Sequence, residues 1–175
     1  SSSSRGSEMC IRDRKGDRVA AYVPNKIETI ICFLACAKNG IIWSSCSPDF
    51  GVQGVVDRFK QIEPKVFITC DYYYYNGKKI NILNKVEEIL KLIPSIKRVI
   101  TYNYNKKEKE KLKKYFNFEE TLMNDLDSDF ERFEFNHPIY ILFSSGTTGK
   151  PKCITHGTGN VLIEHNKEFM LHCDI

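Results

Sequence analysis

The sequence contains no apolar run that approaches the roughly 18 residues of a membrane-spanning helix, and no stretch with the pattern of a secretory signal. It also lacks the paired C-x-x-C spacing that predicts a zinc ribbon or a disulfide scaffold. Its cysteines are odd in number and scattered, and we interpret them as free thiols: Cys10, Cys32, Cys36, Cys46, Cys70, Cys153 and Cys173. These absences predict a protein of a reducing compartment that has no membrane partner.

A strong charge imbalance is absent as well, because 26 basic and 22 acidic residues leave a net charge of only +4. The stretch 106–114 (KKEKEKLKK) holds six lysines against two glutamates. Such a stretch is typical of a solvated face or loop, so we predict no nucleic-acid partner. A composition of 42% hydrophobic and 27% charged residues suits a globular fold.

Short apolar segments alternate with longer segments of helical periodicity. We predict strands at 18–23, 41–43, 65–69, 98–101 and 139–143, and helices at 26–38, 52–62, 80–93 and 161–172. Residues 44–50 and 71–79 are expected to be loops. This alternation predicts an α/β fold with a mostly parallel sheet and flanking helices.

Two segments do not fit the alternation. Residues 1–14 (SSSSRGSEMCIRDR) do not begin with methionine and have no hydrophobic periodicity, so we expect a non-native, adaptor-like or vector-like segment. Residues 105–136 are polar and weakly periodic, which predicts an irregular insertion or connection with, at most, short helices.

The most specific segment follows the apolar run 139–143, which is typical of a strand buried on both faces. The next nine residues, 144–152 (SSGTTGKPK), hold what a triphosphate needs. Glycines allow backbone N–H groups to point at phosphate oxygens, hydroxyls donate hydrogen bonds, and lysines supply positive charge. We therefore predict a triphosphate-binding loop made of Ser144, Ser145, Gly146, Thr147, Thr148, Gly149, Lys150 and Lys152.

Two other interpretations of this loop are less favoured. A flexible linker would not be expected to follow directly from a buried strand with so many donors and charges. A Walker A loop requires G-x-x-x-x-G-K followed by Ser or Thr and a helix. Here Ser144 stands in place of the first glycine, and Pro151 follows Lys150.

Residues 141–152 (ILFSSGTTGKPK) match the signature of the adenylate-forming superfamily, which includes acyl-CoA synthetases, luciferases and nonribosomal-peptide adenylation domains. Within it, the chain resembles the acetoacetyl-CoA synthetases, and the likeness covers nearly all of residues 15–175. The stretches that carry it are 16–20 (GDRVA), 24–25 (PN), 43–51 (WSSCSPDFG), 57–59 (DRF), 75–78 (YNGK), 151–154 (PKCI) and 171–174 (LHCD).

The resemblance implies that residues 15–175 are a fragment of the large N-terminal AMP-binding domain of a cytosolic acid–CoA ligase. ATP and acetoacetate would form acetoacetyl-AMP and pyrophosphate with the help of Mg²⁺, and coenzyme A would then displace AMP. The predicted loop would bind the β and γ phosphates of ATP. The family's acid pocket and catalytic lysine lie downstream, so we assign no catalytic residue and expect this chain alone to be inactive and only marginally folded.

Related acetyl-CoA synthetases carry basic residues at the position of 75–78 that contact coenzyme A phosphates. Lys78 keeps that charge here, whereas Tyr75 departs from the pattern, so the resemblance implies a coenzyme A contact at Lys78 against the alternative of an ordinary surface lysine. His156 borders the loop in sequence, but we favour a structural role for it. His165 and His172 lack a third candidate ligand, so we predict no protein-bound metal site.

Two other functions stay open from the sequence. One is a ligase for another short-chain acid, such as acetate or propionate. The other is a nucleotide-binding module without catalytic activity.

Overall fold

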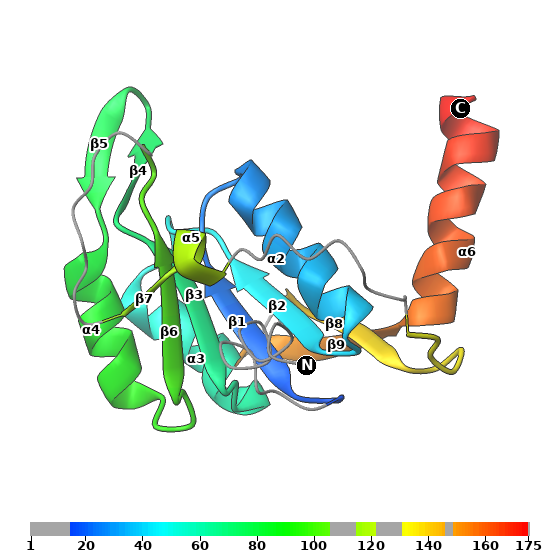
Figure 1. Ribbon diagram of the computed structural model, residues 1–175, viewed down its shortest axis with the longest axis horizontal. Helices are drawn as coiled ribbons and strands as arrows, with labels where there is room; N and C mark the ends of the chain where they lie inside the picture. Colours follow the sequence, from blue (N-terminus) through cyan, green and yellow to red (C-terminus); the bar gives the residue numbers. More distant parts are fainter. Residues whose placement is uncertain (1–14, 106–114, 122–130, 146–148, 175) are drawn as a thin grey trace, which may run out of the picture.

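The computed structural model describes residues 15–105, 115–121, 131–145 and 149–174. Its main element is a seven-stranded sheet with the strand order β7-β6-β3-β1-β2-β8-β9 (Figure 1). Neighbouring strands pair in parallel, apart from the antiparallel pair β8–β9. The predicted α/β class with a mostly parallel sheet is thereby confirmed.

The sheet strands are β1 (Arg18–Tyr22), β2 (Ile42–Cys46), β3 (Val66–Cys70), β6 (Arg98–Tyr102), β7 (Phe116–Asn117), β8 (Pro138–Ser144) and β9 (Lys152–Gly157). A separate two-stranded sheet consists of β4 (Tyr72–Tyr75) and β5 (Lys78–Asn81). The helices are α2 (Ile27–Lys38), α3 (Val52–Ile62), α4 (Leu83–Leu92), α5 (Phe118–Thr121) and α6 (Thr158–Glu168), and α6 continues into η1 (Phe169–Cys173).

Helices cover both faces of the sheet, with α2 on one side and α3 and α4 on the other (Figure 1). The alternation of side chains along β3 explains how both faces are filled. Phe67 packs edge-on against Phe59 of α3, with ring centroids 6.2 Å apart. Its neighbours Val66 and Ile68 point the other way, toward α2. The central strands are therefore buried on both faces, as the apolar runs predict.

The turn residues end the helices where the sequence predicts. Gly40, directly after α2, adopts φ 63°, and a Cβ atom there would lie 2.5 Å from the ring of Phe133. The carbonyl of Gly40 also lies 3.0 Å from Nε2 of His137. Glycine is therefore required at this position both for its backbone angle and for the close approach of the Phe133 ring.

Two segments that the sequence predicts to be loops are strands instead. Residues 44–46 extend β2, because they continue its parallel pairing with β1. Residues 72–79 form most of the β4–β5 hairpin around Asn76 and Gly77, which adopt φ 47° and 74°. Residues 80–81, predicted as the start of the helix 80–93, complete β5 instead, and α4 begins at Leu83. An Asn-Gly pair with positive φ at both positions is the preferred two-residue hairpin turn.

Strand β8 lies where the sequence predicts, but it is not buried on both faces. Tyr140 packs against Phe33 of α2, with ring centroids 6.2 Å apart. Leu142, two residues further along the same face, is 46% exposed, and only Ile141 is fully buried. Among the described residues, the other side chains of β8 are half-buried, so the strand is only partly covered.

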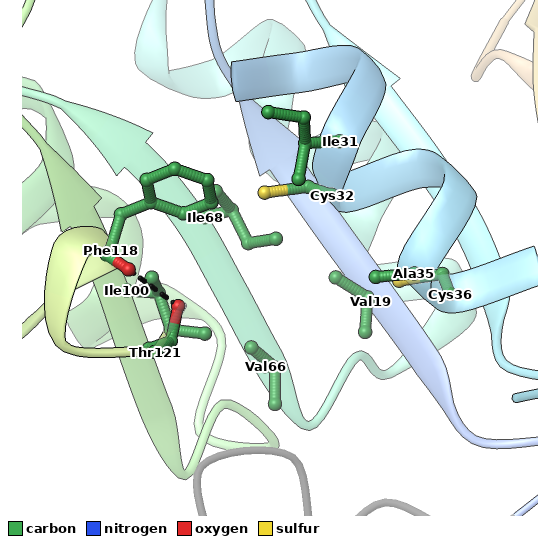
Figure 2. Close-up of a pocket in the computed structure, with 10 residues that line it drawn as sticks. All are labelled: Val19, Ile31, Cys32, Ala35, Cys36, Val66, Ile68, Ile100, Phe118 and Thr121. Atoms are coloured by element: carbon green, nitrogen blue, oxygen red, sulfur yellow. Dashed lines mark hydrogen bonds between the residues drawn. The ribbon is translucent and has the colours of Figure 1, made fainter. Parts of the chain in front are cut away.

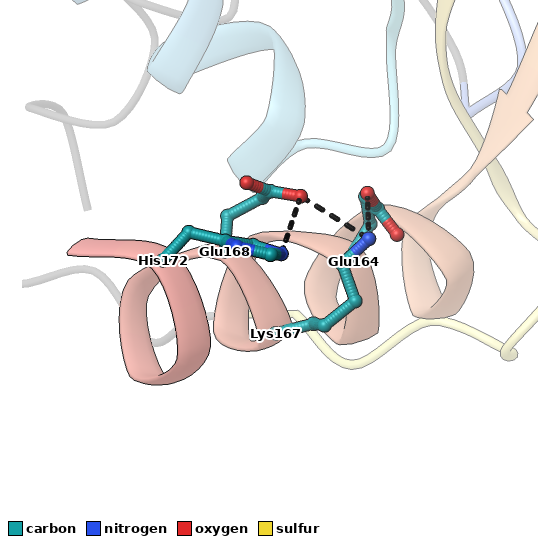
Figure 3. Close-up of polar contacts among 4 residues, drawn as sticks. All are labelled: Glu164, Lys167, Glu168 and His172. Atoms are coloured by element: carbon teal, nitrogen blue, oxygen red, sulfur yellow. Dashed lines mark hydrogen bonds and ion pairs between the residues drawn. The ribbon is translucent and has the colours of Figure 1, made fainter. Parts of the chain in front are cut away.

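Helix α6 stands away from the sheet (Figure 1) and buries only Val161 among its described side chains. Its polar side carries ion pairs: Lys167 lies 2.6 Å from Glu164 and 3.1 Å from Glu168, and His172 lies 3.9 Å from Glu168 (Figure 3). These groups are exposed, so their pairing stabilises the helix only weakly. Apolar residues of α6 and η1 are also exposed: Leu162, Ile163, Phe169, Met170 and Leu171.

The predicted adaptor-like segment 1–14 and the lysine-rich stretch 106–114 lie outside the described residues. Within 105–136, the described residues 115–121 add the short strand β7, which pairs with β6, and the short helix α5. None of the described helices is both long enough and apolar enough to cross a membrane.

The cysteines offer a test of this core. Cys32, Cys46 and Cys70 are buried, and burial raises the pKa of their thiols to about 12, 11 and 12, whereas Cys153 and Cys173 are exposed. Because only accessible thiols can react and the thiolate is the reactive form, iodoacetamide at pH 8 should alkylate the exposed Cys153 and Cys173 before the buried cysteines that the structure describes. Peptide mass spectrometry over a time course measures this order. Alkylation of Cys46 as fast as Cys153 in the folded protein would contradict the packing described here.

Candidate nucleotide-binding site

The parallel strands β1, β2, β3, β6 and β8 all end at the same edge of the sheet. Ligands of open α/β sheets bind in the crevice beyond this carboxyl edge. The chain leaves β2 at Ser47, β3 at Asp71 and β8 at Ser145, and these three exits supply most of the candidate site. The predicted triphosphate loop is the exit from β8.

The loop joins β8 to β9 as an antiparallel turn, with Ser144 opposite Lys152 in the register. Gly149 adopts φ 134°, a backbone conformation that residues other than glycine rarely adopt. Gly146, Thr147 and Thr148 lie outside the described residues. Because the loop returns as a strand, it lacks the helix that a Walker A loop needs, so the sequence-based argument against that motif is confirmed.

The two loop lysines are available to an anionic ligand. Ser145, Lys150 and Lys152 are exposed, and Ser144 is half-buried. Within the described ranges, no carboxylate pairs with Lys150 or Lys152. Positive charge and hydroxyl donors therefore face solvent together at the end of β8.

Helix α3 holds the exit of the loop. The Gln61 side chain donates from Nε2 to the carbonyl of Pro151 at 2.9 Å and to the carbonyl of Asp57 at 2.6 Å. Its Oε1 accepts a weak hydrogen bond from the thiol of Cys153 at 3.6 Å. Our sequence-based prediction missed Gln61, because no local pattern indicates a contact with a residue 90 positions away.

The hydroxyl groups of Ser44 and Tyr22 form hydrogen bonds that hold β8 and the segment after β2 in place. Ser44 in β2 is buried, and its Oγ donates to the carbonyl of Ile141 in β8 at 2.8 Å. The hydroxyl of Tyr22, at the end of β1, lies 2.7 Å from the carbonyl oxygens of both Pro48 and Phe50 and donates to one at a time. Burial raises the pKa of Tyr22, so its hydroxyl stays protonated and keeps this donor role.

Lys78 lies beside the turn of the β4–β5 hairpin, which begins directly after the carboxyl end of β3. It is exposed and stands opposite Tyr75 in the antiparallel register. The hairpin rises from the same edge as the loop (Figure 1). The contact of Lys78 with coenzyme A stays a prediction.

The histidines do not assemble a reactive centre. The ring of His156 packs on Tyr140 with centroids 4.9 Å apart, which agrees with the structural role we favour. His137 stacks on Phe133, and His165 lies near Phe169. No group of three or more His, Cys, Asp or Glu side chains in the described parts of the chain is arranged to hold a metal ion.

A small cavity of about 90 Å³ lies between α2 and α5 (Figure 2). Its lining is apolar apart from two buried thiols and one hydroxyl: Val19, Ile31, Cys32, Ala35, Cys36, Val66, Ile68, Ile100, Phe118 and Thr121. Val19 and Val66 lie near the amino ends of their strands, away from the carboxyl edge. Because no charged side chain is among these lining residues, this cavity does not suit a triphosphate.

A profile of the AMP-binding enzyme family matches residues 12–173 of the chain. The chain is 48% identical over 166 residues to an acetoacetyl-coenzyme A synthetase of Rhizobium meliloti. This alignment covers 91% of the present chain and 25% of that protein. An acetoacetyl-CoA synthetase of Xenopus tropicalis is 45% identical over 169 residues, with the same coverage of 91% and 25%.

Among solved structures, an acetoacetyl-CoA synthetase from Streptomyces lividans superimposes with a TM-score of 0.89 at 38% identity, covering 96% of this chain and 26% of that one. The chain therefore spans about a quarter of the length of the relatives it matches.

The Ser44 contact generates a prediction about the strand that delivers the loop. Ser44→Ala removes the donor to Ile141, which costs about 1 kcal/mol, so amide exchange in residues 139–144 should become about fivefold faster. Ser45→Ala is the matched control, because Ser45 is the exposed neighbour in the same strand. Hydrogen–deuterium exchange mass spectrometry measures both variants. Equal exchange of β8 in the two variants would show that Ser44 does not hold this strand.

Proposed function

Because the chain belongs to the AMP-binding enzyme family, we propose that residues 15–175 are part of the large N-terminal domain of an acetoacetate–CoA ligase. The reaction converts acetoacetate, ATP and coenzyme A into acetoacetyl-CoA, AMP and pyrophosphate. The observation that carries the proposal is the similarity of nearly the whole chain to acetoacetyl-CoA synthetases. The chemistry of the β8–β9 loop supports it independently.

In the first half of this reaction, a carboxylate oxygen of acetoacetate attacks the α phosphorus of ATP. The bond between that phosphorus and the bridging oxygen breaks, and pyrophosphate leaves with the electron pair. The loop binds the β and γ phosphates through Ser144, Ser145 and the following residues, while Lys150 and Lys152 offset the negative charge. Its contribution is positioning and electrostatic stabilisation of the leaving group, with no proton transfer assigned to it.

In the second half, the sulfur of coenzyme A attacks the acyl carbon of acetoacetyl-AMP, the thiol gives up its proton, and AMP leaves. We place coenzyme A against the β4–β5 hairpin, where Lys78 is exposed and carries a charge suited to a phosphate group. The hairpin and the loop rise from one edge of the sheet, so both substrates approach the same side of the domain (Figure 1).

The proposed reaction also uses Mg²⁺. This ion usually keeps several water ligands and is held by substrate phosphates with one or two carboxylates. The hydroxyl oxygens of Ser144 and Ser145 are hard donors of the kind that fits such an ion or its water ligands. When bound with ATP, Mg²⁺ would supply positive charge to the departing pyrophosphate.

We assign the protein to the cytosol. None of the described cysteines forms a disulfide, which suits a reducing compartment. Its proposed partners are the small molecules acetoacetate, ATP and coenzyme A.

The proposal predicts ATP–pyrophosphate exchange by the product of the complete gene that depends on acetoacetate. Lys152→Ala should lower the exchange rate by about 10²–10³, because a preorganised charge on the leaving group is lost. Lys91→Ala, an exposed lysine of α4, is the matched control and should leave exchange unchanged. Exchange driven best by acetate or propionate would identify a different acid, and ATP binding without exchange would identify a non-catalytic nucleotide-binding module.

The hairpin generates a separate prediction about the second half-reaction. Lys78→Ala should raise the KM for coenzyme A about tenfold, the effect of losing one charge-assisted contact, and leave pyrophosphate exchange unchanged. Lys97→Ala is the control, since Lys97 is an exposed lysine at the amino edge of the sheet, just before β6. Steady-state thioester formation at varied coenzyme A gives the KM. An unchanged KM in Lys78→Ala would identify Lys78 as an ordinary surface lysine.

A further inference from the structure

We infer that Asp71 is a positioning residue for the coenzyme A half of the reaction, because it holds the β4–β5 hairpin, and with it Lys78, on the carboxyl edge of the sheet. This inference rests on the proposed function and deepens it. It concerns a carboxylate that the chemistry described above does not use.

Asp71 is the first residue after β3, and it is only 2% exposed. Its Oδ1 accepts hydrogen bonds from the backbone N–H groups of both Tyr72 and Tyr104, each at 2.8 Å. Its own carbonyl accepts the N–H of Ile82 at 3.2 Å. One residue therefore bonds the first residue of the hairpin, the residue that follows the hairpin, and the segment that leaves β6.

The hairpin needs such a connection because β4 and β5 do not extend the main sheet. They form a two-stranded sheet of their own, so the hydrogen-bond ladder of the seven-stranded sheet does not include them. A two-stranded hairpin is at best marginally stable in water unless it packs against other structure. Its position therefore depends on contacts at its base.

Aromatic packing at that base centres on Tyr104, which the carboxylate of Asp71 fixes through its backbone. The ring of Tyr104 contacts Tyr72 and Tyr74, with centroids 5.2 Å and 5.4 Å apart. Lys26 lies over the Tyr104 ring at 4.1 Å from its centroid and also donates to the Tyr104 carbonyl. The ring of Tyr104 thus packs against β4, the first strand of the hairpin, and supports it.

A second contact steadies the hairpin from the neighbouring exit of the sheet. The hydroxyl of Tyr73 is hydrogen-bonded to the carboxylate of Asp49, in the segment that follows β2. Asp71 and Asp49 hold adjacent residues of β4, but only Asp71 joins the two ends of the hairpin. The Asp71 contacts consequently decide how the whole hairpin is oriented.

A displacement of the base of the hairpin also displaces Lys78, which lies beside its turn. The turn at the tip, Asn76 and Gly77, has positive φ at both residues, and the antiparallel pairing runs without a break from Tyr72 and Asn81 to Tyr75 and Lys78. A short, regularly paired hairpin moves largely as one piece. Loosening its base therefore displaces Lys78 from the coenzyme A phosphates while leaving the β8–β9 loop in place.

The test uses the product of the complete gene with Asp71→Ala and Asp71→Asn. Asp71→Ala removes the shared acceptor and should raise the KM for coenzyme A by about tenfold to a hundredfold, while acetoacetate-dependent pyrophosphate exchange stays within about twofold. Amide exchange in residues 72–81 should become faster. Asp71→Asn retains an oxygen at the Oδ1 position and should restore most of the affinity for coenzyme A.

Asp57→Ala provides the matched control, because the carboxylate of Asp57 accepts a hydrogen bond from a neighbouring side chain of α3, Gln53, at 2.7 Å and contacts no residue of the hairpin within the described part of the chain. It should change neither the KM for coenzyme A nor the exchange of the hairpin. If Asp71→Ala does not fold, Asp71→Asn decides the question: its weaker neutral acceptor should raise the KM for coenzyme A by about twofold to fivefold with pyrophosphate exchange unchanged, and an unchanged KM would contradict the inference.

An unchanged KM for coenzyme A in an Asp71→Ala protein whose hairpin exchanges faster would overturn the inference. So would an equal loss of pyrophosphate exchange, which would reveal a general structural role. Failure of the proposed function is distinguishable, because it would appear in the unaltered protein as absent acetoacetate-dependent exchange.

Discussion

Parallel pairing of β8 with β2 is the constraint on which the candidate site depends. The pairing aligns Trp43 with Tyr140, and the buried hydroxyl of Ser44 adds a hydrogen bond to the carbonyl of Ile141. Because β2 is itself paired in register with the central strand β1, this contact places the end of β8 beside the ends of all the other parallel strands. A loop rich in hydroxyls and lysines becomes a binding site only when it reaches that edge.

Two side-chain amide and carboxylate groups then connect the irregular parts of the edge to its rigid parts. Gln61 ties the exit of the β8–β9 loop to the last turn of α3, and Asp71 ties the hairpin to the end of β3. In both, a side chain at or directly after the end of a regular element accepts or donates a hydrogen bond with the backbone of a neighbouring segment. We propose that this arrangement lets glycine and proline set the shape of the loop while the buried sheet and α3 keep it in place.

Local patterns explain which features could be predicted from the sequence. Helix α3 was predicted with its observed bounds, since its apolar stripe and the Glu63-Pro64 stop are local signals. The chemistry of the loop was also inferred from its composition, and it stays a prediction. The β4–β5 hairpin was missed although Asn76-Gly77 indicates a tight turn, because four consecutive tyrosines do not alternate between apolar and polar residues. Ser44, Gln61 and Asp71 were beyond prediction, since each acts on a residue distant in sequence.

The most direct measurement is hydrogen–deuterium exchange of the complete gene product with and without ATP. We expect ATP to slow exchange in peptides that cover the end of β8, the loop and the beginning of β9, from 142 to 153. Peptides at the amino edge, around Lys65 and Lys97, should stay unchanged. Protection confined to the amino edge, with no effect of ATP on residues 142–153, would contradict the placement of the nucleotide at the carboxyl ends of these strands.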